Sequence, residues 1–456
     1  TQRVASSLID CNFINVTSRW FAVYIHGAYR TSVYENDRPQ IIENCTFINC
    51  NGTGEYGGAL GISHNDVIIR NTDFINSTGG QGAAIMVGGI NRNHDAFNGR
   101  NDLANNVTID NCTFINNVAK IEGQSSSDSP TYGNYHADPT GNAGAVFVWG
   151  NDTKILNSVF DSNIAASGEG AAIYIQGQRT IVNNSEFYNH KSDRGAIYVN
   201  GSNTSINNST FMNNTAEDGA CVFVLGNNTV ISGSNFENNT AAVKAAGVFI
   251  EGNDAQIIGS NFTNNNAVDG AGVYIDGHDA VISTSTFVDN EAENGAGVYI
   301  EGENANITGS NFTSNNATDG AGAYIDGHGA SITDSHFKEN VAEDGAGAYI
   351  EGDTTKISGS TFEYNNATNG GAVYMDGHHA DIISNTFDHN NVTNQGGAIY
   401  IEGSGTDINN NNFTNNEAVP ASATGTTGLG GAIYVKGDDT NTNSNDFEHN
   451  KARNGS

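Results

Sequence analysis

The chain has 456 residues, of which 18 are Lys or Arg and 50 are Asp or Glu, so its formal net charge is −32. This balance excludes nucleic acid as an expected partner, because nucleic-acid binding needs Lys and Arg to neutralise phosphates. No apolar run of about 18 residues occurs, so we expect no membrane insertion. No secretory leader is recognisable at Thr1, which indicates a mature chain or a segment of a longer one.

Phenylalanine recurs at a nearly constant interval along the chain. Between Phe187 and Phe413 the interval is 24 to 26 residues, and a fixed period in this range is typical of solenoid proteins. Helical repeats are excluded, because no unit shows a 3.6-residue apolar period. We predict an all-β fold, a right-handed parallel β-helix (β-solenoid) with three short strands per coil and about 16 coils of about 25 residues. The units are marked by Phe13, Phe47, Phe74, Phe114, Phe160, Phe187, Phe211, Phe236, Phe262, Phe287, Phe312, Phe337, Phe362, Phe387, Phe413 and Phe447.

Residues 1–456 are predicted to form a single β-helix in three parts. Residues 1–184 form irregular coils with long loop insertions, residues 185–417 form regular 25-residue coils, and residues 418–456 form a terminal coil with one insertion.

Four insertions interrupt the repeat and contain all four prolines, which cannot donate to a strand ladder. Function in solenoids tends to lie where the repeat is broken, so we expect any specific partner site on these loops. The insertions lie near residues 28–40, 88–105, 120–142 and 419–429.

The direction of side chains in a regular coil follows from the two-residue period of a strand. Val273 and Ile275 should face the core and Tyr274 should face outward, while the Phe column and the Ser residues two positions before it face inward. Asn follows Phe by three residues in twelve of the sixteen units. We expect these Asn side chains to form a hydrogen-bonded ladder and to adopt the left-handed backbone of a sharp corner. Asp-Gly or Asn-Gly, as at Asp269-Gly270, supplies the second corner.

Two short motifs resemble a known repeat family. Gly-Gly-Ala-Ile occurs at Gly396–Ile399, with relatives elsewhere in the chain, and Phe-x-x-Asn occurs at Phe387–Asn390. The pair resembles the repeats of chlamydial polymorphic outer-membrane proteins and of adhesin-like surface proteins of methanogenic archaea. This resemblance implies a cell-surface or secreted β-helix that often serves in adhesion. The low Lys content and the many Asn-x-Ser/Thr sequons look more archaeal than chlamydial.

The outer face of the aromatic strand carries two columns of side chains. Aromatic rings can stack on sugar rings or on a neighbouring rod, and carboxylates about 4.8 Å apart repel one another, which calcium could relieve. The alternative is a solvated face whose rings stack on one another. The surface-contact candidates are Tyr274, Tyr299, Tyr324, Tyr349, Tyr374 and Tyr400, and the weak calcium candidates are Glu251, Asp276, Glu301, Asp326, Glu351 and Asp376. His278, His328 and His378 recur in alternate coils, where we expect them to pair with the acidic column.

Cysteines and sequons suggest covalent features. Cys11 and Cys45 each precede a repeat phenylalanine by two residues in successive units, so they are either within disulfide reach or are two thiols that replace the usual serine. In an exported protein, sequons on surface turns are candidate glycosylation sites, although a chain rich in Asn, Ser and Thr also produces them by chance. The candidates are Asn15, Asn106, Asn151, Asn306, Asn316, Asn366 and Asn391.

We predict a non-enzymatic extracellular protein, adhesin-like or structural, that assembles head to tail into a filament or forms the stalk of a longer surface protein. The expected partners are other copies of the chain, in head-to-tail or lateral contact, and glycans or a host or neighbouring cell surface. No cofactor other than calcium is expected. The alternative is a carbohydrate-active β-helix enzyme, a polysaccharide lyase or hydrolase. Gly327-His328-Gly329 and Asp438-Asp439 match elements of polygalacturonases, but both follow the repeat, which a catalytic site should break.

Overall fold

The computed structural model describes residues 7–26, 39–54, 57–88, 104–120, 141–166, 168–419 and 428–453. Within these residues all regular structure is β-strand, and no helix is long and apolar enough to cross a membrane. The chain divides into two compact units, Thr1–Gly226 and Asn227–Ser456. Because the units are described separately, the predicted division at residues 184 and 417 stays a prediction.

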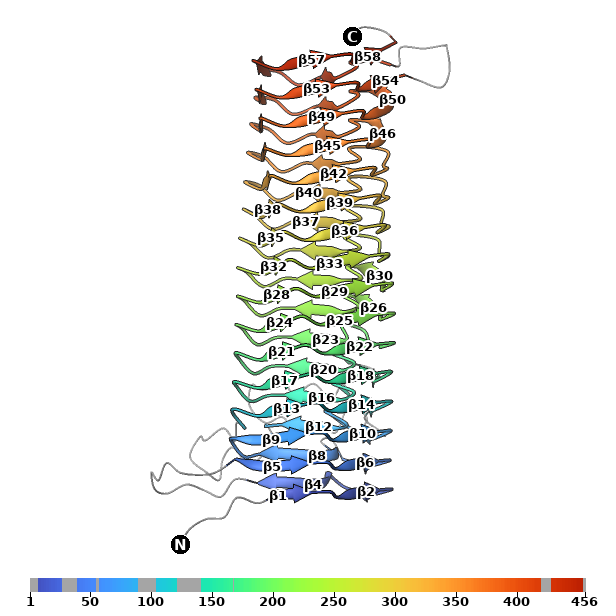
Figure 1. Ribbon diagram of the computed structural model, residues 1–456, viewed down its shortest axis with the longest axis vertical. Helices are drawn as coiled ribbons and strands as arrows, with labels where there is room; N and C mark the ends of the chain where they lie inside the picture. The colour runs from blue at the N-terminus through green and yellow to red at the C-terminus, as the bar shows by residue number, and fades with distance from the viewer. Residues whose placement is uncertain are drawn as a thin grey trace, which may run out of the picture. The chain divides into compact units, whose positions relative to one another are not determined.

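Each unit is a parallel β-solenoid in which every coil adds one strand to each of three sheets (Figure 1). We name the sheets after the residue that their strands stack: the Ile sheet, the Phe sheet and the Tyr sheet, in chain order. Parallel pairing joins like residues of successive coils, as between Phe262 and Phe287 or between Tyr274 and Tyr299. The predicted all-β solenoid class is therefore confirmed.

In the first unit each of the three main sheets has seven strands. The Ile sheet has the order β1 (Ser7–Ile9), β5 (Gln40–Glu43), β9 (Val67–Arg70), β13 (Thr108–Asp110), β17 (Lys154–Leu156), β21 (Ile181–Asn183), β24 (Ser205–Asn207). The Phe sheet has β2 (Asn12–Ile14), β6 (Thr46–Ile48), β10 (Asp73–Ile75), β14 (Thr113–Ile115), β18 (Val159–Asp161), β22 (Glu186–Tyr188), β25 (Thr210–Met212). The Tyr sheet has β4 (Phe21–His26), β8 (Gly58–Ser63), β12 (Ile85–Val87), β16 (Val146–Val148), β20 (Ile173–Ile175), β23 (Ile197–Val199), β27 (Val222–Val224). A fourth sheet joins β3 (Thr17–Ser18), β7 (Asn51–Gly52), β11 (Thr78–Gly79), β15 (Val118–Ala119) and β19 (Ile164–Ala165), and β26 spans Thr215–Asp218.

In the second unit the Ile and Phe sheets have nine strands each and the Tyr sheet has eight. The Ile sheet has β28 (Val230–Ser232), β32 (Gln256–Ile258), β35 (Val281–Ser283), β38 (Asn306–Thr308), β41 (Ser331–Thr333), β44 (Lys356–Ser358), β48 (Asp381–Ile383), β52 (Asp407–Asn409), β56 (Asn441–Asn443). The Phe sheet has β29 (Asn235–Glu237), β33 (Asn261–Thr263), β36 (Thr286–Val288), β39 (Asn311–Thr313), β42 (His336–Lys338), β45 (Thr361–Glu363), β49 (Thr386–Asp388), β53 (Asn412–Thr414), β57 (Asp446–Glu448). The Tyr sheet has β31 (Val248–Ile250), β34 (Val273–Ile275), β37 (Val298–Ile300), β40 (Ala323–Ile325), β43 (Ala348–Ile350), β47 (Val373–Met375), β51 (Ile399–Ile401), β55 (Ile433–Val435). A fourth sheet joins β46 (Asn366–Asn369), β50 (Asn391–Gln395), β54 (Glu417–Ala418) and β58 (Lys451–Ala452), and β30 spans Thr240–Lys244.

The core of each coil is an inward column from each main sheet. Ile257, Phe262 and Val273 are at most 1% exposed in one such coil, and the phenylalanine rings stack on their copies, as Phe262 does on Phe287 with centroids 4.8 Å apart. A coil cannot bury these residues alone, so the stacking of neighbours creates the core.

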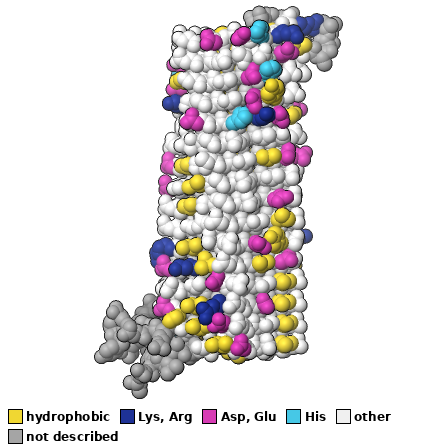
Figure 2. Space-filling view, in the orientation of Figure 1, with side chains coloured by type: hydrophobic (Ala, Val, Ile, Leu, Met, Phe, Trp, Pro, Cys, Tyr) yellow, Lys and Arg dark blue, Asp and Glu magenta, His cyan; other side chains and the backbone are white. Residues whose placement is uncertain are grey.

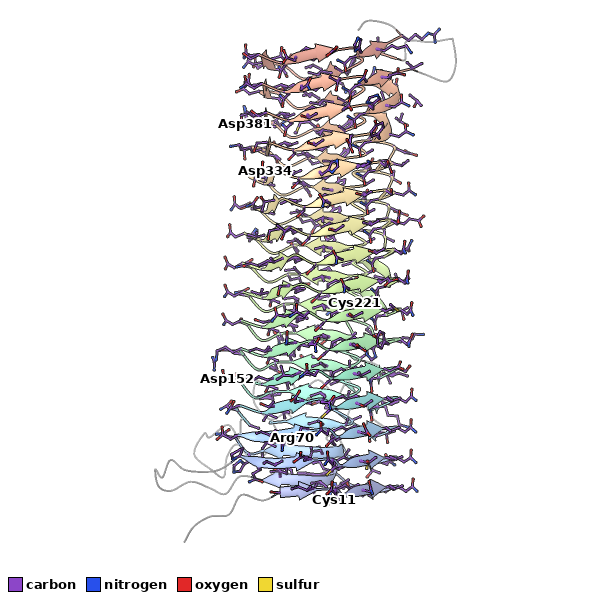
Figure 3. The ribbon with its side chains drawn as sticks, viewed as in Figure 1. Cys11, Arg70, Asp152, Cys221, Asp334 and Asp381 are labelled. Carbon is purple, nitrogen blue, oxygen red and sulfur yellow. The ribbon has the colours of Figure 1, made fainter. Side chains whose placement is uncertain are left out.

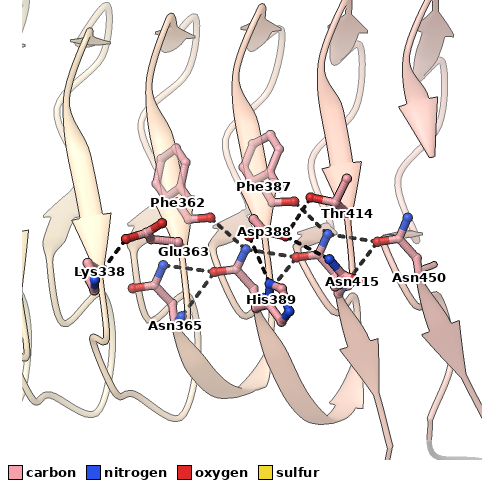
Figure 4. A network of polar contacts seen from close by, with 12 residues as sticks. Lys338, Phe362, Glu363, Asn365, Phe387, Asp388, His389, Thr414, Asn415 and Asn450 are labelled. Atoms are coloured by element: carbon pink, nitrogen blue, oxygen red, sulfur yellow. Dashed lines mark hydrogen bonds and ion pairs between the residues drawn. The ribbon is translucent and has the colours of Figure 1, made fainter. Parts of the chain in front are cut away.

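The predicted Asn ladder lies inside the core (Figure 4). Asn290 is representative: its Oδ1 accepts hydrogen bonds from the backbone N–H and the Nδ2 of Asn265, and its own Nδ2 donates to the carbonyl of Phe262 and to Oδ1 of Asn315. Every polar atom of the buried amide is used, which is the condition for placing it in a core without a large free-energy cost. A second ladder uses serine, since the Ser285 hydroxyl accepts from the backbone N–H of Ser260 and donates to the carbonyl of Ser283.

The left-handed corner lies one residue before the position that the sequence predicts. Asn264 has φ 53°, and the ladder residue Asn265 follows it with an ordinary backbone. The ladder amide must point inward, whereas the turn itself is made by the preceding residue, which points outward and varies in type. The predicted glycine at the second corner is correct, because Gly270 has φ 59° and an added Cβ would lie 2.5 Å from the carbonyl oxygen of Val273.

His190 occupies a position of the Asn ladder but does not form all the hydrogen bonds that an asparagine forms there. Its Nδ1 accepts the backbone N–H of Asn163, which leaves Nε2 buried without a partner. Burial lowers its pKa from 6.5 to about 4. A histidine that is neutral in the folded state but protonated in the unfolded state costs stability as the pH falls from about 6.5 to about 4.

We predict that His190→Asn raises the free energy of unfolding of the protein by about 1–2 kcal/mol near pH 7, because it restores a closed amide ladder. The gain should grow on acidification between pH 6.5 and pH 4, which urea titrations at several pH values would measure. The reverse change, Asn163→His, serves as the control and should destabilise. A variant His190→Asn no more stable than the parent would contradict the ladder account.

Thr284 is a β-branched residue in the left-handed region, with φ 49°, where neighbouring coils have glycine (Gly259 and Gly309). Such a conformation costs a branched side chain about 1 kcal/mol or more. We predict that Thr284→Gly raises the midpoint of thermal unfolding. The matched change Thr286→Gly, in strand β36, should lower it, because glycine weakens an ordinary strand. A lower midpoint for Thr284→Gly would argue against corner strain.

Candidate functional site

The outer face of the Tyr sheet in the second unit carries a continuous aromatic column. Successive ring centroids lie 4.6–5.2 Å apart and the ring planes are nearly parallel, within 3–20°. The members are Phe249, Tyr274, Tyr299, Tyr324, Tyr349, Tyr374, Tyr400 and Tyr434. Because each ring covers the face of its neighbour, the column presents ring edges and hydroxyl groups outward rather than free ring faces.

The tyrosines are less exposed than a simple outward direction predicts. Tyr274 is fully buried, since the Lys244 ammonium lies 4.1 Å from its ring centroid and donates to its hydroxyl, while Glu301 accepts from that hydroxyl. Tyr299, Tyr349 and Tyr374 remain partly exposed. The outward surface of Tyr274 is thus already occupied by the chain itself.

The acidic column two residues further on alternates between Glu and Asp, and the alternation has a structural reason. Tyr374 donates a 2.7 Å hydrogen bond to Oε2 of Glu402, in the next coil. Tyr324 pairs with Glu351 in the same way. Asp is one methylene shorter, so Asp326 acts on Tyr299 through its charge alone. Burial, together with the adjacent carboxylates, raises the pKa of all these tyrosines.

A second polar column flanks the tyrosines on the side of the glycine corner. It contains Asp269, Asn294, Asp319, Asp344 and Asn369, one in each coil. Asn294 donates to Asp269 and Asn369 donates to Asp344, at 2.9 and 2.7 Å. Asp319 and Asp344 are instead direct neighbours without an intervening amide. Burial and the adjacent Asp344 raise the pKa of Asp319 to about 6.

We call the surface between the two polar columns, from Tyr299 to Tyr374, the tyrosine strip. Tyrosine hydroxyls form its floor, with the acidic column on one side and Asp269, Asp319 and Asp344 on the other. Sequence reasoning missed the second column, because Asp-Gly and Asn-Gly were interpreted only as turn formers. The repeated Asp at this position, with no cation beside it in the sequence, was the signal that could have revealed it.

The calcium candidates lie one to a coil along the acidic column. Asp276, Asp326, Glu351 and Asp376 are exposed, as is Glu251, whereas Glu301 is half-buried against Tyr274. No three His, Cys, Asp or Glu side chains of the described residues are grouped so that they could hold a metal ion. Calcium binding therefore stays a prediction.

The three histidines of alternate coils have a different role from the one predicted. Nδ1 of His278 accepts the backbone N–H of Glu303, and His328 and His378 accept those of Asp353 and Ser404. Each ring thus closes a corner of the next coil instead of pairing with the acidic column. In the preceding coil the Oδ1 of Asn253 likewise accepts the backbone N–H of His278. The polygalacturonase-like element at His328 is accounted for by this corner ladder.

The cysteines are all free thiols. The Cys45 thiol donates to the carbonyl of Glu43 and contacts Cys11 of the preceding coil. Cys11 lies two residues before Phe13 and is labelled in Figure 3. Burial raises the pKa of Cys50 to about 11 and that of Cys112 to about 12, so neither thiol is reactive near pH 7. In the structure Cys11 and Cys45 are therefore two neighbouring thiols, and their oxidation to a disulfide stays a prediction.

None of the seven glycosylation candidates is buried, so none is excluded by geometry. Asn15, Asn106, Asn316, Asn366 and Asn391 are exposed, and Asn151 and Asn306 are half-buried. The loop insertions predicted to carry specific recognition, near residues 28–40, 88–105, 120–142 and 419–429, lie almost entirely outside the described residues.

Comparison with known proteins identifies a family. A model described as a right-handed beta helix region matches residues 144–291 and 246–418, and a model of the Chlamydia polymorphic membrane protein repeat matches residues 412–436. No curated protein matches the chain in sequence.

Three solved structures resemble the chain at low identity. Tailspike protein 3 of bacteriophage CBA120 has 10% identity over 90% of this chain and 56% of its own, with a TM-score of 0.43, so the chain spans just over half the length of that tailspike. The A-module of the mannuronan C-5 epimerase AlgE6 of Azotobacter vinelandii has 13% identity over 81% and 90%, with a TM-score of 0.41. PfbA, a surface adhesin of Streptococcus pneumoniae, has 10% identity over 89% and 85%, with a TM-score of 0.33.

We predict that Asp319→Asn raises the free energy of unfolding by about 1 kcal/mol at pH 7, after allowance for solvent screening of a partly exposed group. The raised pKa means that Asp319 stabilises the fold below pH 4, and that this contribution is lost as the pH rises towards 6. Between pH 4 and pH 6 the free energy of unfolding of the parent should therefore fall more steeply than that of the variant. Identical pH profiles for the two proteins would contradict this assignment.

Proposed function

On the premise that the chain belongs to the right-handed beta helix family, we propose that it is a non-enzymatic, adhesin-like protein of the cell surface or extracellular space. The observation that carries this proposal is the periodicity of its polar chemistry. Tyrosines and carboxylates recur in each coil and corner histidines in alternate coils, so the described surface offers a repeated contact instead of one catalytic centre.

Catalysis of glycoside cleavage needs a particular pair of carboxylates or a base beside a cation. In the described residues the acids of the tyrosine strip are neighbours of tyrosines and other acids, and Asp438 belongs to a corner where its backbone N–H donates to Ser404. The recurrence of these acids in every coil, in place of one distinct pair, supports the non-enzymatic proposal over the carbohydrate-active alternative.

The match to a repeat of a polymorphic membrane protein and the acidic composition support a location outside the cell. In this proposal the chain contacts other copies of itself, glycans or a neighbouring cell surface, either as part of a filament or as the stalk of a longer protein. Acidic side chains are spread over the face seen in Figure 2, whereas Lys and Arg gather in a few places.

The test is an activity screen of the purified chain on acidic and neutral polysaccharides, including alginate and pectin. We expect no reducing ends and no unsaturated products above the level of a heat-denatured sample. Reproducible release of either product would overturn the non-enzymatic proposal and assign the chain to the enzymes of this fold.

A further inference from the structure

The tyrosine strip is a long, uncompensated acidic surface. Between Lys244 and Lys436 the sequence contains 25 Asp and Glu but only two cationic residues, Lys338 and Lys356. Lys338 lies on the Phe sheet and pairs there with Glu363 at 3.2 Å, and Lys356 lies on the Ile sheet. Neither side chain therefore belongs to the sheet that carries the strip. No ion pair joins a cation to Asp276, Asp326 or Asp376 in the part of the chain that the structure describes.

The chain's own lysines show which ligand chemistry this surface accepts. Before the strip begins, the primary ammonium of Lys244 lies against the Tyr274 ring and its hydroxyl. Beyond the strip, the Lys436 ammonium contacts Glu402 and interacts through its charge with the hydroxyl groups of Tyr400 and Tyr434. In the first unit Arg194, at the position equivalent to Lys244, lies 5.0 Å from the Phe223 ring centroid. A cation beside an aromatic ring with a carboxylate partner is a favourable arrangement.

Within the strip the position equivalent to Lys244 is acidic or an amide: Asp269, Asn294, Asp319, Asp344 and Asn369. The tyrosines of these coils thus have a carboxylate or an amide where Tyr274 has the Lys244 ammonium, and no lysine of the described residues lies over the rings of the strip. Tyr299, Tyr349 and Tyr374 retain partial exposure, so a small cation can reach them. Because the ring faces stack on one another, a flat sugar ring has no free face to stack on, whereas an ammonium group needs only a ring edge, a hydroxyl and a carboxylate.

We propose that the tyrosine strip binds a linear organic polycation, namely a polyamine whose ammonium groups are separated by three methylenes. The spacing carries this choice of ligand. Successive tyrosine rings in the strip are 4.7–4.9 Å apart, and four single bonds of about 1.5 Å in an extended chain span about 5 Å. One ammonium group can therefore meet the exposed carboxylate of each coil, Asp326, Glu351 and Asp376, although the Tyr324 ring between them is buried. An extended peptide repeats same-side residues at about 6.6–6.8 Å, which does not match the coil spacing.

This inference goes beyond the proposed function, because it concerns a ligand class and holds whether or not the protein acts on polysaccharides. Product release from a polysaccharide would overturn the proposed function and leave this binding unaffected. Conversely, failure to bind a polyamine would leave the non-enzymatic proposal standing.

The experiment is isothermal titration of the full chain with a tetra-amine that has trimethylene spacers, at low ionic strength and pH 7.5. We expect saturable binding that weakens steeply with salt. The triple variant Asp326→Asn, Glu351→Gln, Asp376→Asn should bind at least tenfold more weakly. A matched variant with the same change in charge, Asp279→Asn, Asp334→Asn, Asp381→Asn, lies away from the strip and should bind within about twofold of the parent. Asp334 and Asp381 are labelled in Figure 3.

Two further titrations separate this proposal from its rivals. A tetra-amine of equal charge with hexamethylene spacers should bind at least fivefold more weakly, and Lys244→Met should bind the trimethylene ligand at least threefold more tightly, because it frees Tyr274 and Glu301. Four results would each overturn the proposal. The first two are equal affinity for both tetra-amines and an equal loss of affinity in the two triple variants. The other two are tighter binding of a lysine-rich peptide and displacement of the tetra-amine by calcium but not by magnesium at equal ionic strength. The lysine result does not depend on the triple variants folding.

Discussion

Register between successive coils is the constraint on which the rest of this structure depends. Parallel pairing places each residue on its copy in the next coil, with ring centroids about 5 Å apart in both the Phe and the Tyr columns. A shift of one residue would turn every core side chain outward. The buried Asn ladder enforces the register, because Asn290 can satisfy its amide only when Asn265 and Asn315 lie directly before and after it. Apolar columns alone would tolerate more variation.

The same register that builds the core creates a problem at the surface, where like charges also stack. The chain relieves it in two ways. Glu351 accepts a hydrogen bond from the tyrosine of the preceding coil, and Asn369 donates one to Asp344 in the neighbouring coil. Relief is incomplete in the tyrosine strip, where Asp319 and Asp344 are adjacent, and this incompleteness gives the surface its affinity for cations in our account.

Much of the fold could be predicted from sequence, because each structural position recurs in every coil and the same residue type marks it each time. The period of Phe, the inward Ile and Ser columns and the Asn ladder each follow from one residue type at one spacing. The left-handed residue could not be identified, since Asn264 is followed by Asn265 and either can adopt that backbone. The burial of Tyr274 depends on Lys244 of the preceding coil. This lysine is an exception to the repeat, and the reach of the lysine side chain cannot be read from the sequence. The role of His278 likewise depends on which backbone N–H lies nearby, and a column of histidines in the sequence does not reveal this.

The central claim is that a fully bonded polar ladder in the core holds the coils in register, and hydrogen exchange tests it most directly. The backbone N–H groups of Asn265, Asn290 and Asn315 lie at corners, outside the strands, and donate to side-chain oxygens of the next coil. Native-state exchange measured residue by residue should show these three amides protected to the same degree as the flanking strand amides, near the free energy of global unfolding. Exchange at the rate of open surface turns would show that the ladder does not hold the coils and would contradict the account.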